Sequence, residues 1–274
     1  MIIGYSHVTL SSADLNQDAT WLESLGFVRK FSEEGLVNDP LKGPFLETPA
    51  DTMSMIFLEA PGSIAVELVS YERWADSSVG NYELLLEVPV GYSCDDLQAL
   101  DYHHVWGNTV SRDVGGGSVG SMNIPLSFAR GSGNTGGVLS IRSVTENVGR
   151  ELDFWCRALG CRKGTHSGST PTPWVTAEFA SPFPQWCANL MFVEGDPVPH
   201  PQMDSPGSTC VSILVKDLQE IADTALGAGA LSVSNSFEIE VDGKELKIAI
   251  MRTPTGAIVE LMEYQKPRSR HDRS

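Results

Sequence analysis

The sequence lacks long apolar runs, an excess of positive charge and a recognisable signal peptide. No stretch approaches the roughly 20 apolar residues that cross a bilayer, and the first residues carry neither a basic nor a long apolar region. A net charge of −16 over 274 residues argues against nucleic acid as the main partner, because phosphate binding needs a basic face. We therefore expect a cytoplasmic protein that binds neither nucleic acid nor membrane.

Several cysteine and glycine motifs are also missing. The five cysteines form no Cys-x-x-Cys pair, and their odd number favours reduced thiols over a disulfide framework. No nucleophile elbow or dinucleotide fingerprint is present. The glycine-rich segment 113–120 lacks the Gly-Lys-Ser/Thr ending of a phosphate-binding loop, so we expect a simple connection. The basic segment 268–274 predicts a disordered tail.

A strand, a helix and further strands follow one another in residues 1–71. Alternation of apolar and polar residues predicts a strand at 6–10. Asp14 suits the N-cap of the helix that follows, and Gly26 suits its end. Two more strands are predicted after the helix, at residues 53–59 and 64–69.

The same order of elements returns at residues 138–193 and 208–264, and more weakly at 80–134. Repetition of one supersecondary unit is typical of a fold assembled from copies of that unit. We therefore predict an α+β fold of four βαβββ modules.

These motifs resemble the vicinal oxygen chelate superfamily, which includes glyoxalase I, bleomycin-resistance proteins, fosfomycin-resistance enzymes and type I extradiol dioxygenases. The resemblance rests on segments 7–10, 14–15, 21–27, 65–71, 215–218, 253–256 and 258–264. It implies that pairs of modules close into half-barrel cups around a small ligand. The predicted domains are residues 1–134, with modules 1–71 and 80–134, and residues 135–267, with modules 138–193 and 208–264.

The resemblance also implies a divalent metal, Fe, Mn, Zn, Ni or Co. In the family a His on the first strand of a module and a Glu on its last strand hold the metal. His7 and Glu67 occupy these two positions in the first module. A carboxylate on the otherwise apolar strand face of Glu67 also indicates a buried partner, which a metal would provide.

The other modules depart from this pattern. At residues 138–193 the two positions fall near Ser140 and Asn189, which are poor ligands for these metals. In the last module Glu260 keeps the carboxylate, but Cys210 stands at the His position. A ring-cleaving dioxygenase site in the C-terminal pair of modules is therefore not expected.

Two arrangements could complete a site around His7 and Glu67. The second module could add Glu83 or Glu87 from its first strand. Alternatively, the first and last modules could pair and bring Glu260 to the same site. We favour the second arrangement, because those two modules are the best preserved copies.

Two classes of function follow. The first is a metal-dependent enzyme of lyase, isomerase or dioxygenase type that acts on a small oxygenated molecule, with His7 and Glu67 as catalytic residues and His7, Glu67 and Glu260 as metal ligands. The alternative is a metal-free protein of the same fold, either a sequestering protein or an acid–base enzyme that uses His7 and Glu67. The adjacent His103 and His104 cannot both face one site from a strand, and their role stays open. We expect a monomer or a homodimer.

Overall fold

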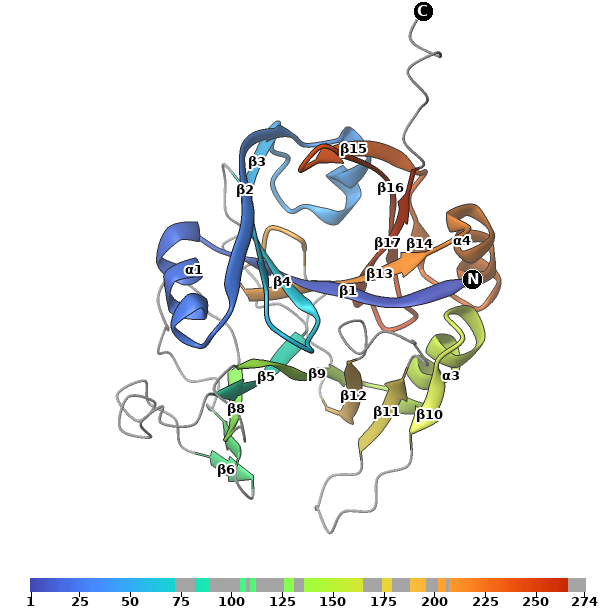
Figure 1. Cartoon of the computed structure of the whole chain (residues 1–274). Helices are drawn as coiled ribbons and strands as arrows, with labels where there is room; N and C mark the ends of the chain where they lie inside the picture. Colours follow the sequence, from blue (N-terminus) through green and yellow to red (C-terminus); the bar gives the residue numbers. More distant parts are fainter. Residues whose placement is uncertain are drawn as a thin grey trace, which may run out of the picture.

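The computed structural model describes residues 1–71, 82–88, 104–106, 109–111, 126–130, 136–164, 174–178, 188–195, 202–205 and 207–265. It confirms the predicted α+β class, with two curved halves of sheet and a few helices (Figure 1). Three predicted features lie outside the described residues: the helix that the weaker module 80–134 would have at 95–100, the connection at 113–120 and the tail 268–274. No helix in the described part of the chain is long and apolar enough to span a membrane.

The first half of the sheet combines the first and the last module. Its strand order is β2 (Val28–Val37), β3 (Thr52–Glu59), β4 (Ala65–Tyr71), β1 (Ile2–Ser11), β13 (Gly207–Val215), β17 (Ile258–Tyr264), β16 (Lys244–Arg252) and β15 (Phe237–Val241). The central pair β1 and β13 is antiparallel, and each of these strands has a parallel neighbour on its other side, β4 and β17. Figure 1 shows these strands curving into a cup in the upper half of the molecule. The short strand β14 (Ser232–Val233) adds to β16.

The second half of the sheet repeats this plan with the two middle modules. Its order is β10 (Arg162–Gly164), β11 (Trp174–Glu178), β12 (Asn189–Glu194), β9 (Gly137–Thr145), β5 (Tyr82–Val88), β8 (Leu126–Arg130), β7 (Thr109–Ser111) and β6 (His104–Trp106). Each half therefore draws one module from either side of residue 134. The predicted division at that residue does not coincide with the strand pairing, and the domains 1–134 and 135–267 stay a prediction.

Three helices start in the same way at the matching place of their modules: α1 (Leu15–Ser24), α3 (Val148–Ala158) and α4 (Leu218–Gly227). Each follows an Asp or Asn whose side-chain oxygen accepts a hydrogen bond from a backbone N–H in the first turn. The distances are 3.0 Å for Asp14 and Gln17, 2.9 Å for Asn147 and Arg150, and 3.1 Å for Asp217 and Glu220. The predicted end of α1 is confirmed, since Gly26 has φ of 96°.

One hydrophobic core joins all four modules. The fully buried side chains of Tyr5, Tyr82, Trp155 and Val211 represent the modules in chain order. The Tyr82 hydroxyl also donates a hydrogen bond to the carbonyl oxygen of Ile258 at 3.0 Å, which links the second module to the last. A separate cluster, which includes Met53, Met55 and Ile248, lines the inside of the first cup.

Glu151 is a buried carboxyl between the third and the last module. It accepts hydrogen bonds from the indole Nε1 of Trp155 at 3.0 Å and from the hydroxyl of Thr255 at 2.7 Å. Burial raises the pKa of Glu151 above its ordinary value of 4.5, and these donors offset only part of the effect. The folded protein therefore retains a proton there at a pH at which the unfolded chain has lost it.

We expect the stability of the wild type to fall, relative to Glu151→Gln, as the pH rises from 4.5 through the raised pKa of Glu151. In this range the folded state binds one more proton than the unfolded state, so deprotonation favours unfolding. The Gln side chain can accept from Trp155 and donate to Thr255. Urea unfolding of both proteins between about pH 4 and pH 8 measures the effect. A constant difference in unfolding free energy over that range would contradict it.

Several strands and one short helix were missed by the sequence pattern, among them β2 and β15. Strands β2 and β15 lie at the edges of the first cup, and most of their side chains are exposed or half-buried, so the apolar alternation is weak. The 3₁₀ helix Pro40–Phe45 follows β2 and starts after Asp39, whose carboxylate accepts from the backbone N–H of Leu41 at 2.9 Å. This helix places an additional charged side chain in the cup.

Candidate active site

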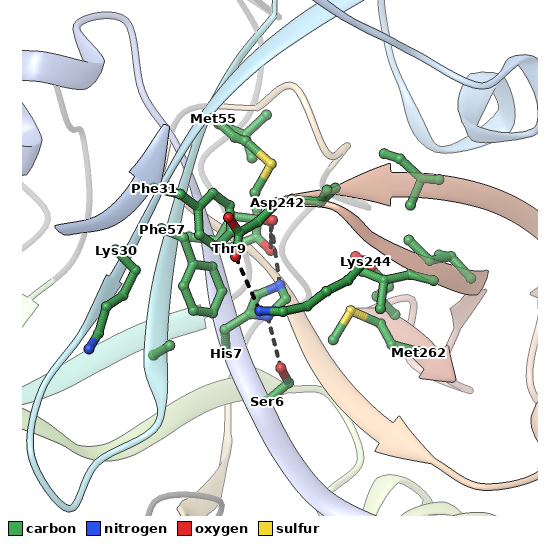
Figure 2. Close-up of a pocket in the computed structure, with 18 of the residues that line it drawn as sticks. Ser6, His7, Thr9, Lys30, Phe31, Met55, Phe57, Asp242, Lys244 and Met262 are labelled. Atoms are coloured by element: carbon green, nitrogen blue, oxygen red, sulfur yellow. Dashed lines mark hydrogen bonds and ion pairs between the residues drawn. The ribbon is translucent and has the colours of Figure 1, made fainter. Parts of the chain in front are cut away.

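The first cup encloses a cavity of about 600 Å³. His7 on β1, Glu67 on β4 and Glu260 on β17 all line it, so the structure brings together the three site residues predicted from the sequence. Apolar side chains cover much of the wall: Phe31, Met53, Met55, Phe57, Val69, Ile248 and Met262. In Figure 2 the rings of Phe31 and Phe57 lie on one side of His7, with Lys244 and Met262 on the other.

Strand alternation and register explain why these side chains meet. On β1, His7 and Thr9 face the cavity, whereas the intervening Val8 belongs to the core shared by the four modules. Thr9 lies beside Glu67 in the parallel register of β1 and β4. In the last module Ser212 lies beside Glu260 in the same way.

His7 and Glu67 form a largely buried pair, with side chains that are 4% and 15% exposed. The Nε2 atom of His7 lies 3.4 Å from Oε2 of Glu67, an ion-pair distance without the geometry of a hydrogen bond. Within the described residues, Nε2 has no hydrogen-bond partner although His7 is only 3% exposed. The Thr9 hydroxyl donates to the same Glu67 oxygen at 2.8 Å, and Nδ1 of His7 lies 3.1 Å from the Ser6 hydroxyl (Figure 2). Ser6 and Thr9 therefore orient the two members of the pair.

Burial and charge act in opposite directions on this pair. Burial alone would lower the pKa of His7, but the nearby Glu67, and to a smaller extent Glu260, raise it above 6.5. Burial would raise the pKa of Glu67, but the charge of His7, hydrogen bonding and the charge of Lys42 lower it. Burial and the charge of Glu67 together raise the pKa of Glu260. Each member of the pair thus favours the charged form of the other.

Lys42 is a site residue that sequence reasoning missed. It lies on the 3₁₀ helix Pro40–Phe45, is 5% exposed and lines the same cavity as the His7–Glu67 pair. Its Nζ atom lies 3.5 Å from the sulfur of Met53 and 5.8 Å from the ring centre of Phe237. A positive charge at residue 42 could be predicted, but its position over the cup depends on the fold of the 38–51 segment.

Cys210 occupies the place in the last module that His7 has in the first. In the antiparallel register His7 lies opposite Ser212 and Thr9 lies opposite Cys210, as a two-fold relation between the modules requires. The thiol is fully buried and donates toward the carbonyl oxygen of Val211 at 3.8 Å. Burial and the charges of Glu260 and Glu67 raise the pKa of Cys210 well above its ordinary value, which favours the thiol over the thiolate.

The described part of the second cup does not keep the ligand pattern. Arg142 takes the place of Thr9 in the third module and forms an ion pair with Glu83 at 2.5 Å. Neither Glu83 nor Glu87 lines the first cavity. By register, the residue beside Arg142 is Met191, which corrects the sequence-based placement of the Glu position near Asn189. Met191 is no better a ligand for these metals than Asn189, so the third module supplies no carboxylate at this position.

Other histidines contribute no described side chain to the site. His104 begins β6 in the second half of the sheet, whereas His103, His166 and His200 lie outside the described residues.

No model of a protein family matches the chain, and no curated protein matches its sequence at a significant level. Solved structures do match its fold. Glyoxalase I from Zea mays shares 15% sequence identity, with a TM-score of 0.62 over 95% of this chain and 92% of that chain. A candidate dioxygenase from Bacillus subtilis shares 12% identity, with a TM-score of 0.61 over 97% of this chain and 86% of that chain.

These matches extend over almost the whole chain and include both cups. At such low identity they carry the fold and not the chemistry. Together with the modules and their strand pairing, they confirm the fold predicted from the sequence motifs. The chain has the fold of the vicinal oxygen chelate superfamily.

Proposed function

We propose that the first cup is the active site of an enzyme that acts on a small oxygenated organic molecule. The observation that carries this proposal is the buried His7–Glu67 pair, at 3.4 Å, facing a cavity of about 600 Å³. A buried pair of ionisable groups that shift each other's pKa values in a cavity is typical of catalytic sites. The apolar wall with a few convergent polar groups also suits a small organic ligand.

We further propose that His7, Glu67 and Glu260 hold a divalent metal. The donor types fit such an ion, and the buried Nε2 of His7 has no hydrogen-bond partner in the described part of the chain. When Nδ1 of His7 donates to Ser6, Nε2 carries the lone pair that a metal needs. A bound metal would supply a Lewis acid for the ligand oxygen. Among the described His, Cys, Asp and Glu residues no three are grouped closely enough to hold an ion, so binding requires the three side chains to move closer together.

A metal-free enzyme on the same residues is the second candidate. The ion-pair distance between His7 and Glu67 favours it, because the two groups can share a proton and pass it to a ligand in the cavity. The Thr9 hydrogen bond holds the Glu67 carboxylate in place for this transfer. The positive charge of Lys42 acts on Glu67 and Glu260 without a metal.

Metal content decides between these two candidates. We expect the wild type, loaded with Mn, Fe, Co, Ni or Zn and desalted, to retain about one ion per chain by mass spectrometry. His7→Ala and Glu260→Gln should each lose most of it. Glu59→Gln should not, because Glu59 lines the same cavity but pairs with Lys30 at 3.0 Å. A wild type that retains none of the five metals would refute the metal site.

Activity then tests the enzyme itself. Wild type, His7→Ala and Glu59→Gln should be screened with a panel of small ketones, hydroxy acids and diols. We expect turnover of at least one compound by the wild type and by Glu59→Gln, and its loss in His7→Ala. Turnover that survives His7→Ala would exclude both candidate mechanisms at this site.

A further inference from the structure

Lys42 brings an ammonium group with unused donors into the first cup. The side chain is 5% exposed, and its described contacts are the Met53 sulfur at 3.5 Å and the ring of Phe237 at 5.8 Å. A thioether is a weak acceptor, and an ammonium group has three N–H donors. In the described part of the chain no carboxylate lies within ion-pair distance of Nζ. A buried charge without close partners is costly unless a ligand satisfies it.

The segment that carries Lys42 is held firmly over the cup. The Asp204 carboxylate accepts hydrogen bonds from the backbone N–H groups of Glu47 and Thr48, both at 2.8 Å. The backbone N–H of Met203 donates to the carbonyl oxygen of Phe45 at 2.7 Å. The ammonium group is thus positioned before a ligand binds, and little ordering is needed on binding.

Lys42 differs from the other lysines that line the cavity, because each of those has a carboxylate partner within ion-pair distance. Lys30 pairs with Glu59 at 3.0 Å, and Lys244 pairs with Asp242 at 3.2 Å. Both of these lysines are about half exposed, so they lie at the rim. Of the three lysines in the described lining, Lys42 alone offers its donors to the buried part of the cavity.

The charges of the buried lining determine which oxygen Lys42 can accept as a partner. His7 and Lys42 supply the positive groups, and Glu67 and Glu260 supply the negative groups. Since these charges balance, the buried lining offers an anion no excess of positive charge, whereas a neutral carbonyl oxygen needs only a donor. The apolar wall includes the stacked rings of Phe31 and Phe57, whose centroids lie 5.1 Å apart. Such a wall suits the hydrocarbon part of a ligand.

We propose that Lys42 donates a hydrogen bond to the carbonyl oxygen of a small, uncharged, apolar-bodied ketone or ester bound in the first cup. The proposal rests on the proposed function only in taking this cup as the ligand site, and it does not require the metal. With the carbonyl oxygen at Lys42, the carbon beside it lies in the cavity that the His7–Glu67 pair faces. If the Glu67 carboxylate takes a proton from that carbon, Lys42 would also stabilise the negative charge that develops on the carbonyl oxygen.

Binding of three matched probes to chelator-treated protein tests the proposal by fluorine NMR. The probes are 4-fluoroacetophenone, 4-fluorotoluene, which has no acceptor, and 4-fluorobenzoate, which is an anion. We expect the wild type to bind the ketone about tenfold more tightly than either other probe. Lys42→Met should lose this preference while it still binds 4-fluorotoluene. The control Lys30→Met should keep the preference.

Two further measurements keep the result decisive if Lys42→Met folds poorly. Lys42→Arg retains a cationic donor and should retain the preference for the ketone. In wild type with ¹³C-labelled lysine, the ketone should shift the Lys42 side-chain signal and leave that of Lys30 in place. Any of three results would overturn the proposal. Lys42→Met could keep the preference for the ketone, the wild type could prefer the benzoate, or the wild type could bind none of the probes. Metal content does not enter this test, so failure of the metal site would leave its result unchanged.

Discussion

Replacing Gly136 by Ala is expected to lower the free energy of unfolding by about 2–3 kcal/mol. A Cβ atom at this position would collide with the backbone carbonyl oxygens of Leu25 and Glu87. Backbone atoms cannot rotate away as a side chain can, so the chain segments themselves would have to separate. The collision would also strain the hydrogen bond from the Gly136 N–H to Leu25 at 2.8 Å, which links the first module to the start of β9.

Chemical denaturation of wild type and Gly136→Ala measures this loss, and Gly149→Ala is the matched control. Gly149 lies in the first turn of α3, where a Cβ atom would meet only the Asn147 side chain at 3.5 Å, an ordinary contact. Alanine should be neutral or stabilising there, by up to about 1 kcal/mol. Equal stabilities of the two variants would show that the close approach at Gly136 is not a constraint in solution.

Removing the Glu67 carboxylate is expected to move the pKa of His7 from above 6.5 to below it in metal-free protein. Burial is the largest influence on His7 and favours the neutral ring, and Glu67 supplies most of the opposing effect. Glu260 contributes less, so it cannot maintain the protonated form alone. The pair at 3.4 Å therefore favours the protonated form of His7.

Titration of the His7 ring signals by NMR in wild type and Glu67→Ala measures the change. Glu59→Ala serves as the control, since Glu59 lines the cavity but does not contact His7. In the wild type the raised pKa also means that stability falls as the pH rises through it, because the folded state holds the proton longer than the unfolded chain. A His7 pKa that stays above 6.5 in Glu67→Ala would show that Glu67 is not the cause of the shift.

Local signals in the sequence were sufficient to predict the module plan. Asp14 and Gly26 mark a helix whose cap and end the structure reproduces, because such signals act over one turn of chain. Strands β2 and β15 escaped prediction, because an edge strand can be stable with weak alternation when its partner strand is buried. The fold class could therefore be predicted, but not every strand.

The site could be predicted only in part. Alternate residues of a strand point to the same face, so the sequence predicts that His7 and Thr9 share one face. The pairing of β1 with β13 cannot be predicted in this way, because it depends on which surfaces fit together between segments far apart in the chain. Lys42 was missed for the same reason, since only tertiary contacts such as those of Asp204 bring its segment over the cup.

The order in which the modules pair has a consequence for synthesis on the ribosome. The two middle modules are neighbours in the chain and can meet early, whereas β1 must wait for β13, which is made near the end. Until then one long edge of β1 lacks its partner, and exposed strand edges promote aggregation. A nascent or truncated chain that ends before residue 207 therefore has no complete first cup, and it should depend on chaperones more than the finished protein does.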